Sequence, residues 1–164
     1  MKQATAVRVW AVTALGAAMA VASAGRLQAQ ANDPFVGIWK LNVAKSKFDP
    51  GPAPKRSIAM FTTLGDRMKV VSDSTTAAGV LAHWEYTAGH DGKEYPMTGS
   101  PDADTVSLKR INPSTVESTY KKGGKVTLVN TRTVAPDGKT MTVTVKGTNA
   151  QGQKVSNVLV YEKG

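Results

Sequence analysis

The 164-residue chain contains no cysteine, and this absence excludes whole classes of protein. Without thiols it can form no disulfide framework, no thiolate metal site and no cysteine nucleophile. Aromatic residues are scarce, at 6% of the chain, and acids are outnumbered, with 12 Asp and Glu against 21 Lys and Arg. The 41% share of hydrophobic residues is ordinary for a folded chain, which excludes disorder throughout, and the length allows one domain.

A long uncharged run is present near the start of the chain. Lys2 and Arg8 precede residues 9–24, which are mostly Ala and Val and carry no charge. A spanning helix needs about 20 apolar residues, so this shorter run is typical of a signal peptide and not of a membrane anchor. We therefore predict a signal peptide over residues 1–31, cleaved after Ala29 or Ala31. The mature chain, residues 32–164, is expected to be exported, periplasmic or secreted, with no membrane span.

The positive charge of the mature chain is moderate and dispersed. Removing residues 1–31 takes away Lys2, Arg8 and Arg26 and no acid, so 18 cationic residues face 12 acids, a net charge of +6. The remaining lysines occur about once per predicted strand and are not gathered with aromatic residues along one element, as a nucleic-acid surface requires. We therefore expect no nucleic-acid partner, and we expect a monomer.

Short alternating runs of Val, Thr and Ile dominate the mature chain, and no segment has sustained helical spacing. Ten strands are predicted, at residues 35–41, 56–63, 67–73, 80–87, 93–97, 105–111, 115–121, 125–134, 140–148 and 154–161. Gly- and Asp-containing turns such as Pro136-Asp137-Gly138 join them, so each strand should run antiparallel to the next. The prediction is an all-β fold, a ten-stranded antiparallel up-and-down β-barrel without exposed edges.

Two further features bear on the interior and the end of this barrel. In the strand 125–134, Leu128, Asn130 and Arg132 share one face. Asn and Arg on an otherwise apolar face are typical of a barrel interior that holds polar groups. The proline-rich segment 42–55 is expected to be irregular, with a helical turn at residues 44–47, and to cover one end of the barrel.

The mature chain resembles the fatty-acid-binding proteins and the wider lipocalin group at both ends. Its start, residues 35–41, contains the Gly-x-Trp signature at Gly37 and Trp39, and its end, residues 160–163, reads Val-Tyr-Glu-Lys. The chain as a whole is most similar to bacterial exported proteins described only as lipocalin-like. The resemblance implies a barrel that encloses a small apolar or amphiphilic ligand, with Trp39 plugging one end.

The resemblance also implies a ligand site. In fatty-acid carriers, an arginine on a late strand and an Arg-x-Tyr pair on the last strand hold the ligand carboxylate. Tyr161 matches the tyrosine, but Leu159 occupies the position of its arginine, and Arg132 matches the other arginine with an offset of one residue. The candidate ligand-binding residues are Arg132, Tyr161, Tyr120 and Asn130. The alternative is that Arg132 lies at the surface or the barrel mouth and that both tyrosines are core residues.

Catalytic and metal-binding patterns are weak. His83 and Glu85 share one face of a predicted strand, and His90 is the second histidine, so an enzyme or metal site would need these three to converge. We expect no enzymatic activity, no cofactor and no metal. Trp84 and Tyr86 share the other face, where they either floor a cavity or pack a barrel end, and we favour packing.

Two functions stay open. The first is an exported carrier of an apolar or amphiphilic ligand such as a lipid or a carboxylate, and it predicts a pocket of at least ~300 Å³. The alternative is a non-enzymatic structural or interaction module of the cell envelope with a filled barrel.

Overall fold

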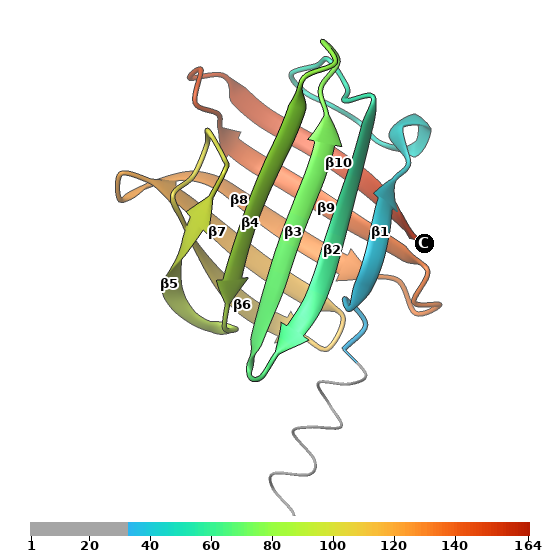
Figure 1. Ribbon diagram of the computed structural model, residues 1–164, viewed down its shortest axis with the longest axis vertical. Coiled ribbons are helices and arrows are strands. Elements are labelled where there is room, and N and C mark those ends of the chain that lie inside the picture. The colour runs from blue at the N-terminus through green and yellow to red at the C-terminus, as the bar shows by residue number, and fades with distance from the viewer. Residues whose placement is uncertain (1–32) are drawn as a thin grey trace, which may run out of the picture. The chain divides into compact units, whose positions relative to one another are not determined.

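The computed structural model describes residues 33–164, and the predicted signal peptide lies outside this range. Within it, a closed barrel contains ten antiparallel strands, each paired with its neighbours in sequence, and β1 closes the ring against β10 (Figure 1). The strands are β1 (Gly37–Leu41), β2 (Arg56–Leu64), β3 (Arg67–Thr75), β4 (Leu81–Ala88), β5 (Asp91–Thr98), β6 (Thr105–Asn112), β7 (Thr115–Lys122), β8 (Lys125–Val134), β9 (Thr140–Thr148) and β10 (Lys154–Lys163). The predicted fold class is confirmed.

Alternation places one face of each strand in the core. On β9, Met141, Val143 and Val145 are buried, while the intervening Thr142 and Thr144 are half-buried. The β7–β8 hairpin turns through Gly123 and Gly124, which both have positive φ, as a two-residue hairpin turn favours. In the described part of the chain, the one helix is a 3-10 turn, η1 (Val43–Lys45), and no helix there is long and apolar enough to cross a membrane.

Most strands differ from the prediction by one or two residues at one or both ends, and two of these differences have a clear local cause. Asp91 and Gly92, expected in a turn, open β5, where the register with β6 shifts between Asp91 and Glu94 and Gly92 has a φ of 76°. The strand therefore begins with a bulge that turn residues can form. At the start of the chain, Phe35 precedes β1 and lies in a turn held by Asp33, whose carboxylate accepts the Phe35 N–H at 3.0 Å.

One end of the barrel is closed by side chains. Trp39 is fully buried there, and its Nε1 donates to the Phe35 carbonyl at 2.7 Å. Arg110 on β6 forms an ion pair with Asp33 and lies over the Phe35 ring, 5.5 Å from its centre. The expected plug at Trp39 is thus present, and an arginine and its carboxylate partner fasten it. We call this the closed end.

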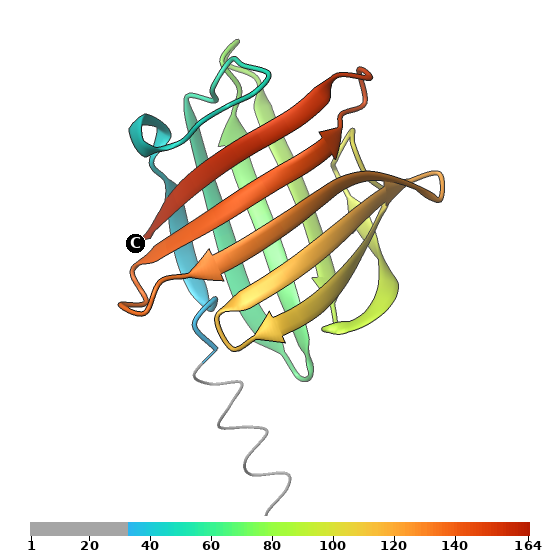
Figure 2. The ribbon, with the colours of Figure 1, turned by 180° about the vertical axis from the view of Figure 1, so that it is seen from behind.

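We call the opposite end of the barrel the mouth. It carries the β3–β4, β5–β6, β7–β8 and β9–β10 connections together with residues 42–55 (Figures 1 and 2). The first part of residues 42–55 runs along β10, since Lys47 pairs with Val158 and the Asp49 carbonyl accepts from the Ser156 N–H at 2.6 Å. The expected helical turn is the 3-10 turn η1, which begins one residue and ends two residues earlier than predicted.

Candidate functional site

The inner face of β8 runs from the mouth to the closed end and sets the depth of each side chain. Leu128 lies opposite Tyr120 of β7, Asn130 opposite Ser118, and Arg132 opposite Val116. Alternate residues of a strand are about 7 Å apart. Leu128 and Tyr120 therefore belong to an apolar layer near the mouth, and Asn130, Ser118 and Arg132 form a polar layer beneath it. The predicted polar face of this strand is therefore an interior face.

Arg132 is buried in this polar layer, with 5% of its surface exposed. Its Nη1 donates to the Tyr86 hydroxyl at 2.8 Å, and its Nη2 donates to the Ser118 hydroxyl. The guanidinium also lies over the Phe61 ring, 5.5 Å from the ring centre. The interpretation of Arg132 as a surface residue is wrong, because strands β2, β4 and β7 all contribute to its surroundings.

The charge of Arg132 has no carboxylate partner among the described residues. It is the one charged side chain that is fully buried in this part of the chain, and none of the ion pairs there includes it. Its Nε has no hydrogen-bond partner. A buried charge is costly unless it is paired and hydrogen-bonded, and this guanidinium has hydrogen bonds but no ion pair among the described residues.

Aromatic residues connect the polar layer with the mouth. The Trp84 and Tyr86 rings on β4 are stacked, with centres 5.9 Å apart and planes 6° apart, and Tyr86 meets Tyr120 edge to face at 6.4 Å. Burial raises the pKa of the Tyr120 hydroxyl above its usual value, the neighbouring Tyr86 raises it further, and the charge of Arg132 opposes the rise. Tyr120 therefore stays neutral at physiological pH and does not neutralise Arg132.

Tyr161, on the inner face of β10, is also buried. Burial raises the pKa of its hydroxyl, and a hydrogen bond with Ser57 together with the charge of Arg132 opposes this rise. Tyr161 is thus a core residue that also lies within the electrostatic reach of Arg132.

A cavity of about 120 Å³ lies on the mouth side of the polar layer. Strands contribute Trp84, Met97, Tyr120, Leu128 and Asn130 to its walls. The β5–β6 connection contributes Ser100, Asp102 and Ala103, and the cavity is open to solvent on one side. The Oδ1 atom of Asn130 is buried without a hydrogen-bond partner. The volume is well below the pocket of at least ~300 Å³ that the carrier interpretation predicted.

The β5–β6 connection is fastened over this cavity by its two aspartates. Asp102 accepts the Ala150 N–H at 2.6 Å, and its carbonyl accepts from the Thr127 hydroxyl at 2.8 Å. Asp104 accepts the Gly123 N–H at 2.9 Å. Between them, Ala103 is buried among the core residues. These contacts join the β5–β6, β7–β8 and β9–β10 connections at the mouth into one wall beside the cavity.

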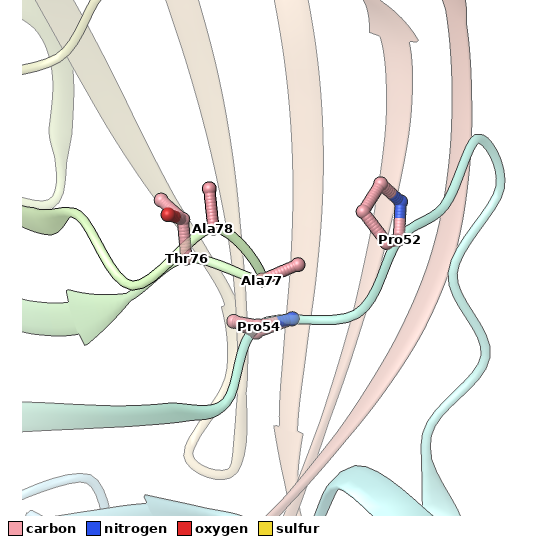
Figure 3. A pocket seen from close by; sticks show the side chains of 5 residues that line it. All are labelled: Pro52, Pro54, Thr76, Ala77 and Ala78. Carbon is pink, nitrogen blue, oxygen red and sulfur yellow. The ribbon is translucent and has the colours of Figure 1, made fainter.

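A second recess, of about 300 Å³, lies farther out at the mouth. Figure 3 shows Pro52 and Pro54 opposite Thr76, Ala77 and Ala78 of the β3–β4 connection, and these five residues line it. Among them, Thr76 alone has a polar side chain, and none is charged. The recess can contact an apolar group but offers nothing to hold an anion.

The residues considered for catalysis or metal binding do not converge. His83 lies on the outer face of β4 and contacts Asp73 at 2.7 Å, and Glu85 on the same face pairs with Lys69 at 3.0 Å. His90 lies at the closed end, where its Nε2 is 3.4 Å from Arg110. Within residues 33–164, no group of three or more acidic or histidine side chains is arranged to hold a metal ion.

The structure brings the four predicted ligand residues to one interior. Tyr120 and Asn130 line the cavity, while Arg132 and Tyr161 lie in the core beyond it. Sequence reasoning missed Ser118, although it alternates with Tyr120 and faces inward on β7. The preference for packing holds for Tyr86, which is buried, but Trp84 lines the cavity.

Comparisons with known proteins find similarity to solved structures alone. Neither a scan against protein-family models nor a search of the curated proteins finds a match. A solved structure similar to this chain is that of zebrafish ileal bile acid-binding protein complexed with cholic acid, with a TM-score of 0.48. The two sequences are 12% identical, and the match covers 80% of this chain and 99% of that one. The resemblance to bacterial exported lipocalin-like proteins stays a prediction.

Proposed function

We propose that this protein is an exported carrier that binds a small amphiphilic molecule inside its barrel, with the anionic head of the ligand at Arg132. The observation that carries the proposal is the buried guanidinium, which has hydroxyl and aromatic neighbours but no carboxylate partner in the described residues. An anion at this position would supply the missing charge, and charge-assisted hydrogen bonds to a guanidinium are among the stronger ones in proteins.

The surroundings of Arg132 support an amphiphilic ligand. The layer above it, towards the mouth, is formed by Trp84, Met97 and Leu128, so the apolar part of a ligand would lie there. Asn130 and Arg132 lie deeper on the same face of β8. A ligand would therefore bind with its charged group inward and its apolar group towards the mouth.

The test is to denature the purified protein and identify the released small molecules by mass spectrometry. A chemically uniform anion is expected at about one per chain. Arg132→Met should weaken retention at least about 10-fold, because hydrogen bonds to charged groups contribute about 1.5–3 kcal/mol, and Arg132→Lys should retain part of the binding. Arg56→Met, at an exposed arginine of β2, is the matched control and should retain the ligand.

The proposed export has its own test. Expression of the full chain followed by cell fractionation and N-terminal sequencing should find a chain that begins at Gln30 or Asn32 outside the cytoplasm. A chain that keeps Met1 and stays in the cytoplasm would contradict it.

The second candidate function is an interaction module with a filled barrel. The observation that favours it is the small cavity, about 120 Å³, beside exposed apolar residues at the mouth such as Leu81, which is 79% exposed. If the native protein releases no ligand and binds no carboxylate in a calorimetric titration, the carrier proposal is wrong and the interaction module replaces it.

A further inference from the structure

The size of the interior cavity restricts which ligand it accepts. Its volume is about 120 Å³, whereas pockets for larger small molecules span about 300–1,000 Å³. An engineered cavity of about 150 Å³ in another protein binds benzene. The cavity therefore matches about one six-membered ring, with substituents reaching inward to the polar layer or outward to solvent.

The walls favour an aromatic ring over an alkyl chain. Trp84 is held in place by its stacking on Tyr86, and Tyr120 meets Tyr86 edge to face. Both Trp84 and Tyr120 line the cavity, together with the Met97 thioether. Aromatic pairs gain about 0.5–1.5 kcal/mol beyond the burial of their area, and methionine sulfur contacts ring edges favourably. An aromatic ligand would therefore make favourable ring contacts with Trp84, Tyr120 and Met97.

Two polar side chains lie on the inner side of the cavity: Asn130 is one of its walls, and Arg132 lies deeper on the same face of β8. Asn130 Oδ1 is a buried acceptor without a donor, and Arg132 Nε is a buried donor without an acceptor. A carboxylate accepts from a guanidinium, and a hydroxyl donates to an amide oxygen. A ligand that carries both groups would offer a donor to the Asn130 side chain at the cavity wall and an anion to the charge of Arg132 beyond it.

From these observations, and resting on the function proposed above, we propose that the ligand is a monocyclic aromatic carboxylate that also carries a hydroxyl group. Its ring lies against Trp84 and Tyr120, its hydroxyl donates to Asn130, and Arg132 attracts its carboxylate. Asp102 lies at the rim of the same cavity, where it accepts the Ala150 N–H. Its negative charge opposes an anionic ligand, and solvent at the open side of the cavity weakens that repulsion.

The test is a calorimetric titration of the purified protein with benzoate, its three monohydroxy isomers and dodecanoate. We expect benzoate to bind at least about 10-fold more tightly than dodecanoate, because the longer chain exceeds the cavity. At least one hydroxybenzoate should bind about 3- to 10-fold more tightly than benzoate, through one added hydrogen bond.

Single substitutions test the separate parts of the proposal: the hydroxyl, the aromatic wall and the charge at the rim of the cavity. Asn130→Leu should remove the preference for the hydroxyl, so that no hydroxybenzoate binds more tightly than benzoate, because the apolar side chain offers no acceptor. Trp84→Leu should weaken all the benzoates about 3- to 10-fold, whereas Tyr95→Leu, at a half-buried aromatic residue outside the cavity, is the matched control. Asp102→Asn keeps an oxygen for the Ala150 N–H and should tighten binding about 2-fold.

The outcomes separate this inference from the proposed function. If dodecanoate binds more tightly than every benzoate and Arg132→Met weakens it, the aromatic ligand is wrong and the carrier stands. If the benzoates bind equally and Asn130→Leu changes nothing, the role of the hydroxyl is wrong. If no carboxylate binds, both proposals are wrong. The ligand series and Asn130→Leu keep the test decisive even where the Arg132 variant does not fold.

Discussion

The closed end and the polar layer each hold an arginine inside the barrel, but the two arginines have different partners. Arg110 forms an ion pair with Asp33 and donates to the Pro113 carbonyl at 2.9 Å. Arg132 contacts hydroxyls and a ring, and no carboxylate of the described residues pairs with it. The difference indicates that the charge of Arg110 is satisfied within the chain, whereas the charge of Arg132 is not, and under the proposed function a ligand supplies the missing partner.

The largest difference between the two ends should appear on removal of a tryptophan. Trp39→Ala should lower the free energy of unfolding by about 3–5 kcal/mol, because it deletes a large, fully buried side chain and leaves a cavity at the closed end. Trp84→Leu, at the half-buried cavity wall, should cost about 1 kcal/mol or less. Urea denaturation of both variants measures these changes, and equal losses would show that the mouth is as well packed as the closed end.

Replacement of each arginine tests the comparison directly. Arg110→Met should lower the free energy of unfolding by about 1–3 kcal/mol, because the mostly buried Asp33 carboxylate loses its partner. Arg132→Met should change it by less than about 1 kcal/mol, since the loss of two hydrogen bonds is offset by the removal of an unpaired buried charge. Denaturation without ligand checks both values, and a larger loss for Arg132→Met would assign Arg132 to the fold.

Acid should weaken the closed end. Burial and, to a smaller extent, the positive charge of Arg110 lower the pKa of His90 to about 4, although the negative charge of Asp33 opposes this effect. As the pH falls from 6.5 towards 4, the unfolded chain binds a proton before the folded chain does, so stability is lost in that window. After allowance for the partial exposure of His90, the loss should be about 1–2 kcal/mol.

His90→Gln is the variant that isolates this effect. It removes the titrating group, so its free energy of unfolding should change less between pH 6.5 and 4 than that of the unchanged protein. Denaturation curves at several pH values give the comparison. Parallel curves for the two proteins would assign the acid sensitivity to other groups.

The smallest effect is expected at the rim of the mouth. Leu81→Lys should change the free energy of unfolding by less than about 0.5 kcal/mol, because the side chain is exposed and makes little contact with the core. Thermal unfolding of the variant checks this. A clear destabilisation would show that exposed apolar residues at the mouth also stabilise the fold, as the buried residues of the closed end do.

The strands and most turns could be predicted because their signals are local. Alternation of Met141, Val143 and Val145 with threonines identifies a half-buried strand from nine residues alone. The same logic fails where a turn residue enters a strand, as at Asp91 and Gly92, since a bulge depends on the register with β6. The sequence pattern placed Phe35 in the first strand, but the structure does not. Its position outside β1 depends on contacts with Arg110 and Trp39, which the local pattern does not show.

The candidate site was predictable in part. The face of Asn130 and Arg132 follows from alternation, and Tyr161 was identified through a family resemblance. The hydrogen-bond partners of Arg132 could not be predicted, because Tyr86 lies 46 residues from it in the sequence and Ser118 lies 14 residues from it. No local pattern indicates which hydroxyl will meet a given guanidinium across a barrel.

The sequence by itself determined the strand pattern, the inward position of Asn130 and Arg132, and the absence of thiol chemistry, because these depend on residue identity and a period of two. The tertiary structure decided that Arg110 meets Asp33 while Arg132 meets no carboxylate of the described chain. It also decided that about 120 Å³ stays open beside Asn130. Both outcomes depend on how the closed barrel brings side chains from distant strands together, and no strand carries that information alone.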